Sequence, residues 1–83
     1  MSTKLFVGSL PWSVSDENLK EKFQEYGTVV SAKIITDRYT GKSRGFGFVE
    51  MENPSEAKEA MNALNDSEMN GRNIVVNEAR DRN

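Results

Sequence analysis

The segment Arg44-Gly-Phe-Gly-Phe-Val-Glu-Met51 determines the fold that we expect for this chain. We interpret it as a β-strand, in which successive side chains point to opposite faces of a sheet. Its even-numbered residues then share one face, which carries Arg44, Phe46, Phe48 and an acid. Its odd-numbered residues share the other face, where two glycines precede a valine and a methionine. One face is therefore aromatic, and the other suits close packing against helices.

The aromatic face has two interpretations. A Phe-x-Phe pair in a strand is often part of a buried core, and the pair alone leaves this alternative open. The interleaved glycines favour a binding face, because glycine weakens a strand interior and usually marks a bulge or a close backbone approach. A base stacked on an aromatic ring gains about 1–3 kcal/mol. We therefore predict that Phe46 and Phe48, beside a cation, form a platform for nucleobases.

The rest of the chain supplies three further strands and two helices. Alternating residues predict strands at 4–8, 29–36 and 73–79. This alternation places Phe6, Lys33 and Asn77 on the same face as the aromatic pair. Apolar residues at helical spacing, with capping residues before them, predict one helix between Ser13 and Gly27 and another from Pro54 to Leu64.

The order strand, helix, strand, strand, helix, strand predicts an α+β, ferredoxin-like βαββαβ sandwich. Each helix has a single apolar face, so both helices should cover the same side of a four-stranded antiparallel sheet. The other side stays open, and Phe6, Phe46 and Phe48 meet there. Three aromatic side chains on an uncovered face are unfavourable unless they bind something.

Two loops next to the sheet carry further candidates. We expect Trp12 to be partly buried against the edge of the domain, and the alternative is that it extends the stacking surface. The loop at 37–43 is polar, and its cations are either solvated or contacts for phosphates. Beside an aromatic strand we favour phosphate contacts for Lys42 and Arg44, and we leave Arg38 open. Arg80 either reaches a strand lying across the sheet or belongs to a frayed tail.

Composition excludes several classes of function. The 83 residues suffice for one domain. The absence of cysteine and histidine removes disulfides, thiolate metal sites and the commonest general base, so we expect no metal, no cofactor and no enzyme activity. No segment resembles a signal peptide or a membrane span. An intracellular, cytoplasmic protein is the expectation, with a nuclear site open in a eukaryote. The net charge of −2 predicts binding by stacking and a few phosphate contacts.

Residues 44–51 also resemble the signature octamer of the RNA-recognition-motif family, Lys/Arg-Gly-Phe/Tyr-Gly/Ala-Phe-Val-x-Phe/Tyr. Only Met51 departs from it, and Met51 faces the predicted core. Residues 5–10 resemble the family's second signature, with Ser9 in place of the usual asparagine. The resemblance covers about residues 4–80 and is to small proteins with a single motif.

The resemblance implies a sheet with strand order 4-1-3-2 that binds single-stranded RNA, or in some members DNA. It implies that Phe6 and Phe48 stack on bases, that Phe46 lies near the sugars and that Arg44 meets a phosphate. Asn77 and Ala79 stand where the family reads base edges, partly through main-chain groups. We expect a monomer. The rival function is a protein-interaction module on the same fold, since some family members bind peptides.

Overall fold

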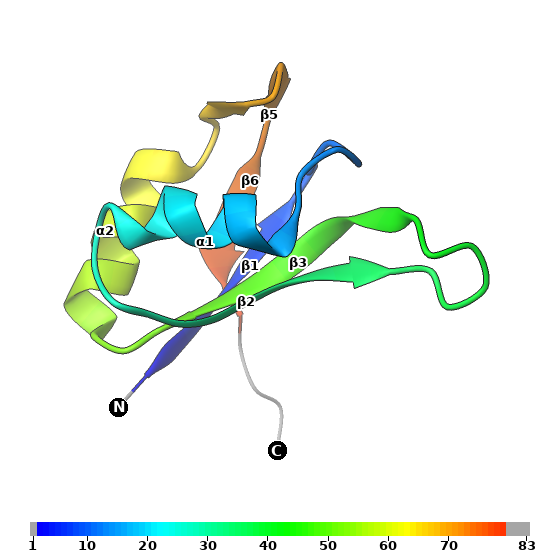
Figure 1. Cartoon of the computed structure of the whole chain (residues 1–83). Helices are drawn as coiled ribbons and strands as arrows, with labels where there is room; N and C mark the ends of the chain where they lie inside the picture. Colours follow the sequence, from blue (N-terminus) through cyan, green and yellow to red (C-terminus); the bar gives the residue numbers. More distant parts are fainter. Residues whose placement is uncertain (1, 80–83) are drawn as a thin grey trace.

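The computed structural model describes residues 2–79, apart from the side chains of Ser43 and Arg44. The helices and strands follow one another along the chain as in Figure 1: β1 (Thr3–Gly8), α1 (Asp16–Gln24), β2 (Val29–Thr36), β3 (Ser43–Met51), α2 (Pro54–Leu64), β4 (Glu68–Met69), β5 (Arg72–Asn73) and β6 (Val75–Glu78). Arg80, one of the predicted site residues, lies outside the described residues.

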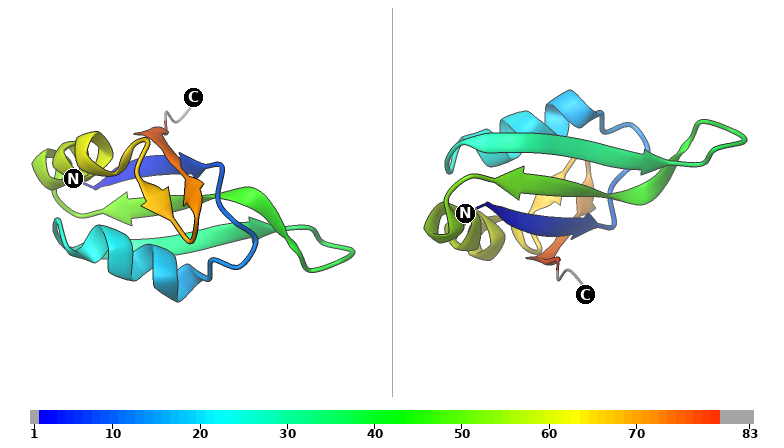
Figure 2. Two further views of the ribbon diagram at one scale, coloured as in Figure 1. Left: turned by 90° about the horizontal axis from the view of Figure 1, so that it is seen from above. Right: turned by 90° about the horizontal axis from the view of Figure 1, so that it is seen from below.

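The main sheet has the order β2-β3-β1-β6, and the strands pair antiparallel throughout. This is the predicted order 4-1-3-2 viewed from the other edge, with β6 as the fourth strand. Both helices pack on one side of the sheet (Figure 2). The predicted βαββαβ sandwich is therefore confirmed.

Between α2 and β6 the chain forms a short hairpin. Strands β4 and β5 pair with each other and not with the main sheet. Asn70 and Gly71 form the turn between them, with φ angles of 52° and 86°. Positive φ at both central residues is what a type I′ turn requires, and Asn-Gly is its preferred sequence. The sequence patterns analysed above did not predict the two-residue strands of this hairpin.

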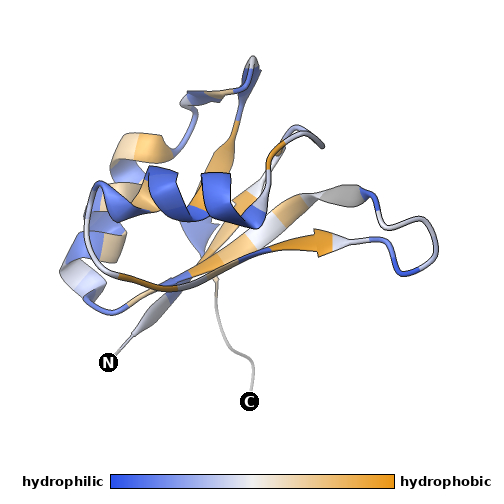
Figure 3. Cartoon of the chain, viewed as in Figure 1, coloured by the Kyte–Doolittle hydropathy of each residue, from blue (hydrophilic) through white to orange (hydrophobic). Residues whose placement is uncertain are grey.

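The core lies between the helices and one face of the sheet, as the orange segments of Figure 3 indicate. Val49 and Met51 of β3 have exposed fractions of 0%. Other fully buried side chains come from β1, from β6 and the residue before it, from the helices and from the β1–α1 loop: Leu5, Val7, Leu10, Leu19, Phe23, Ala57, Ala60, Ile74 and Val76. Met51, the one departure from the family octamer, thus lies in the core as predicted, where a flexible thioether packs well.

The backbone conformation and packing of β3 explain its two glycines, Gly45 and Gly47. Gly45 has a φ of +86° and lies where the β2–β3 register shifts. Its carbonyl accepts a hydrogen bond of 2.8 Å from the Leu10 N–H, which ties the β1–α1 loop to the sheet. Gly47 lies against the main chain of β2, since a Cβ there would be 2.5 Å from the Lys33 carbonyl oxygen. A bulge and a close approach, which are common uses of glycine in strands, both occur.

Candidate nucleic-acid interface

Four side chains form a row across the open face of the sheet. Cα pairing places Phe48 of β3 opposite both Lys33 of β2 and Phe6 of β1. Phe6 is in turn opposite Asn77 of β6. Each of these residues has a buried neighbour in sequence that belongs to the core: Leu5, Val7, Ile34, Val49 and Val76. Since side chains alternate, all four residues of the row face away from the helices.

The three phenylalanines pack against one another on this face. The Phe6 ring centroid lies 5.8 Å from that of Phe46 and 5.9 Å from that of Phe48. Phe46 and Phe48 are 6.3 Å apart at an interplanar angle of 87°, the edge-to-face arrangement that aromatic rings prefer. The Phe6 ring also lies over Gly8, where a Cβ would be 2.8 Å from its Cε2 atom. The rings therefore hold one another in place before any ligand binds.

Two charged residues on the open face were not among the predicted site residues. Lys4 of β1 is paired with Glu50 of β3, and this pair lies two residues along the strands from the pair of Phe6 and Phe48. The Lys4 Nζ atom lies 6.0 Å from the Phe48 ring centroid, at the limit of a cation–π contact. The Glu50 carboxylate accepts a hydrogen bond from the Ser2 hydroxyl. Strand alternation alone could have identified both residues, because Lys4 shares the face of Phe6 and Glu50 that of Phe48.

The structure brings some predicted site residues together and leaves others apart. Phe6, Phe46, Phe48, Lys33 and Asn77 share the open face. Ala79 lies beside β1, and its N–H donates to the Lys4 carbonyl at 2.9 Å, so this main-chain donor is already occupied. Lys42 is exposed in the β2–β3 loop, beyond the end of the row. Arg44 is placed in β3 by its backbone only.

The prediction that Trp12 is partly buried was wrong, because 81% of its surface is exposed. Leu10 and Val14 take the buried positions of the β1–α1 loop, with exposed fractions of 2% and 4%. The Val14 N–H donates to the Pro11 carbonyl at 3.1 Å. This turn places Trp12 at its tip, pointing away from the core.

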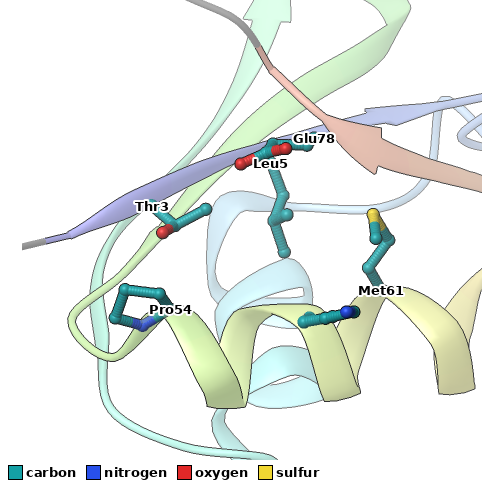
Figure 4. A pocket seen from close by; sticks show the side chains of 6 residues that line it. Thr3, Leu5, Pro54, Met61 and Glu78 are labelled. Atoms are coloured by element: carbon teal, nitrogen blue, oxygen red, sulfur yellow. The ribbon is translucent and has the colours of Figure 1, made fainter.

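One concave feature of the chain lies away from the aromatic face. A hollow of about 310 Å³ opens between α2 and the strands β1 and β6 (Figure 4). Its lining is Thr3, Leu5, Pro54, Lys58, Met61 and Glu78. Within residues 2–79, no cluster of three or more acidic side chains could hold a metal ion. Neither helix in this range is long and apolar enough to cross a bilayer.

The chain is a two-layer α+β sandwich, and the open, aromatic face of its sheet is its candidate binding surface. A sequence model described as RNA recognition motif matches residues 5–75. The chain therefore belongs to the RNA recognition motif family, as its signatures indicated.

Several relatives resemble the chain over nearly all of its length. It is 50% identical to glycine-rich RNA-binding protein 2, mitochondrial, of Arabidopsis thaliana, over 99% of this chain and 52% of that protein. It is 47% identical to the 28 kDa ribonucleoprotein, chloroplastic, of Spinacia oleracea, over 98% of this chain and 35% of that protein. The chain thus spans about half the length of the first relative and a third of the second. These names give no support to a cytoplasmic location.

Solved structures agree with the fold. RNA Binding Protein PG1 superposes with a TM-score of 0.92 at 48% identity, and the match covers 98% of both chains. The Sxl-lethal protein/RNA complex superposes with a TM-score of 0.87 at 37% identity, over 93% of this chain and 47% of that one.

Proposed function

We propose that this chain binds single-stranded RNA on the open face of its sheet. The observation that supports this most is the row of Lys33, Phe48, Phe6 and Asn77, which joins a cation, two aromatic rings in edge-to-face contact and an amide across all four strands. The relatives named as RNA-binding proteins, and the neighbour solved as an RNA complex, point in the same direction. An intracellular site is part of this proposal, since mitochondria and chloroplasts, named for two relatives, lie inside cells.

The chemistry of the row suggests how a short target is held. Phe6 and Phe48 offer ring faces on which two bases can stack, and Phe46 braces both rings from the side that the sugars would occupy. Lys33 and Lys42 are exposed cations that can meet phosphates, and Arg44 and Arg80 are proposed for the same role. The Asn77 amide can both donate to and accept from a base edge. Main-chain reading at Ala79 would have to use its carbonyl, because its N–H is already bonded.

We propose binding without catalysis, and a target of about two to four nucleotides on the sheet itself. The chain has no histidine and no cysteine, and its aromatic face is not a pocket. Single-stranded DNA presents similar base faces and phosphates, and it differs in lacking the 2′-hydroxyl and in carrying thymine, with its methyl group, in place of uracil.

A titration of isotope-labelled protein with random-sequence RNA tetramers, followed by backbone amide NMR shifts, tests the proposal. We expect the largest shifts at Phe6, Phe46, Phe48 and Asn77, and small shifts on the outer faces of α1 and α2. The matching DNA pool measures the contribution of the 2′-hydroxyl. The absence of shifts at low salt and millimolar RNA would refute RNA binding and leave the rival function, a protein partner for the open face, as the next hypothesis.

The Glu50→Gln variant should bind RNA more tightly than the parent. Glu50 places a carboxylate two residues from Phe48 on the face that a polyanion would cover. Removing the charge should raise affinity about two- to fivefold at low salt, because a unit charge about 4 Å from another is worth about 1 kcal/mol in water. Fluorescence anisotropy at two salt concentrations measures this, and the gain should shrink as salt screens the repulsion.

Glu59→Gln is the matched control for Glu50→Gln. It makes the same chemical change at an exposed position of α2, on the helix side of the molecule. We expect no change in affinity. Equal tightening by both variants would mean that net charge alone matters and that Glu50 does not lie beside the bound RNA.

A further inference from the structure

Two aromatic side chains outside the sheet are strongly exposed. Trp12 has 81% and Tyr39 has 90% of its surface exposed, the largest fractions among the large hydrophobic residues that the structure describes. A single exposed hydrophobic residue is normal in a protein. A pair requires an explanation only if the two residues belong to one surface, so their positions decide whether they matter.

Both residues lie at the same end of the sheet. Strands β1 and β2 each pair antiparallel with β3, so they run parallel to one another. Trp12 follows the end of β1 and Tyr39 follows the end of β2. The two views of Figure 2 agree in placing the β1–α1 and β2–β3 loops at one end. The bond from Leu10 to Gly45 links the first loop to the strand that follows the second.

Both aromatics are presented by ordered turns. Trp12 stands on the turn closed by Val14 and Pro11. In the β2–β3 loop, the Asp37 carboxylate accepts from the N–H groups of Tyr39 at 2.8 Å and Thr40 at 3.1 Å. The Asp37 carbonyl accepts from the Gly41 N–H at 2.8 Å. The loop is therefore ordered by its own hydrogen bonds. A ligand that stacks on Tyr39 would cause little further loss of backbone conformational entropy.

The charge around Tyr39 suits a polyanion. Arg38 and Lys42 flank Tyr39 in the loop and are exposed, whereas the acid beside them, Asp37, is half-buried and turned to the loop backbone. Aromatic side chains interleaved with cations are typical of grooves that bind single-stranded nucleic acids without sequence preference. A protein partner would meet the same rings, but the excess of positive charge favours RNA.

We propose that an RNA strand stacked on Phe6 and Phe48 continues past the end of the sheet and stacks further bases on Trp12 and Tyr39. This inference rests on the proposed RNA binding of the sheet and lengthens its site. Arg38 and Lys42 meet the phosphates between the stacked bases. The chain then covers more nucleotides than its sheet alone, and the added contacts are tolerant of sequence because every base has a flat face.

Trp12 is the only tryptophan of the chain, so its fluorescence reports contact at this end of the sheet directly. The experiment titrates the full chain with random-sequence RNA pools of four and of eight nucleotides. Both pools should shift the Phe48 amide in NMR spectra. Only the octamers should quench Trp12 emission, because a tetramer stacked on the sheet leaves no base to reach the loop.

The variants Trp12→Ala and Tyr39→Ala should each lower octamer affinity about five- to tenfold and leave tetramer affinity unchanged. Both side chains are almost fully exposed, so thermal melting should be unaffected and should confirm folding. Val30→Ala is the matched control, because Val30 is also an exposed hydrophobic residue, at 55%, but lies at the start of β2. It should change neither affinity.

The possible outcomes separate this inference from the function on which it rests. Octamers that shift the Phe48 amide without quenching Trp12, and that bind Trp12→Ala as tightly as the parent, would overturn the extended site and leave sheet binding intact. Pools that shift no amide of the sheet would refute RNA binding altogether. Trp12 emission that changes with protein concentration and not with RNA would assign these rings to self-association and overturn the inference.

Discussion

Phe48→Ala should weaken RNA binding more than any other single change on the open face. Phe48 lies at the centre of the row, opposite both Lys33 and Phe6, and a base stacked on its ring contributes about 1–3 kcal/mol. Its ring also braces Phe46 and Phe6 at 6.3 and 5.9 Å, so their orientation loosens as well. The affinity should therefore fall about 5- to 150-fold, measured by fluorescence anisotropy with labelled RNA tetramers.

The stability of the Phe48→Ala protein should change little. Phe48 is half-buried, and the contacts that it loses within the protein are those of an aromatic cluster, worth about 1 kcal/mol. Urea unfolding of the same preparation measures this. The comparison of the two measurements identifies the face, because a residue of the core would show large destabilisation and no specific loss of affinity.

Val49→Ala is the control that the sequence itself provides. Val49 is the next residue of β3, is fully buried and points to the helices. Its truncation should lower the free energy of unfolding by about 2 kcal/mol, as expected for a cavity in a small core, and leave the affinity of the folded molecules unchanged. A Phe48→Ala protein that unfolds but binds normally per folded molecule would mean that the two faces of β3 are wrongly assigned.

The residues that alternate could be predicted from the sequence, and the reason is geometric. Side chains in a regular strand alternate with a period of two residues. Once Phe46 and Phe48 are assigned to the open face, the faces of the neighbouring residues in regular strand conformation follow. Phe6, Lys33 and Asn77 fell on the open face by the same rule. The register of strand pairing could not be predicted from the sequence. This register places Phe6 opposite both Phe48 and Asn77. Pairing depends on contacts between distant segments, whereas alternation is local.

The conformation of the β1–α1 loop could not be predicted from local patterns, because it depends on which residues the core accepts. Leu10 and Val14 fill space beneath the β1–α1 loop, and Trp12 is excluded as a result. Asp16 illustrates the same limit. It is the first residue of α1, and its carboxylate accepts a 2.7 Å hydrogen bond from the Ile34 N–H, a contact between distant segments that no local pattern shows. Asp16 thereby occupies a main-chain donor of β2, an edge strand that could otherwise pair with another chain.

Gly47→Ala should destabilise the fold more than its single added methyl group suggests. A Cβ at Gly47 would lie 2.5 Å from the Lys33 carbonyl oxygen and 3.0 Å from the Ile34 Cα atom. Both are main-chain atoms of the neighbouring strand, so no rotamer change can relieve the overlap, and β2 must move away from β3. We expect a loss of about 3 kcal/mol in the free energy of unfolding, at the upper end of the range for overpacking.

Gly47→Ala should weaken the pairing of β2 with β3 more than the rest of the sheet, and amide hydrogen exchange can detect this difference. Protection should fall first at the β2–β3 pairing around Ala32 and Val49, while the β1–β6 pairing keeps its protection. Gly41→Ala is the control, because it makes the same change where no atom lies within 4 Å, and its φ of +74° should cost about 1–2 kcal/mol. RNA affinity should also fall for Gly47→Ala, since the strand that must move carries Lys33 beside Phe48. A Gly47→Ala protein with full stability and full affinity would mean that close approach of the two strands is not why glycine stands between Phe46 and Phe48.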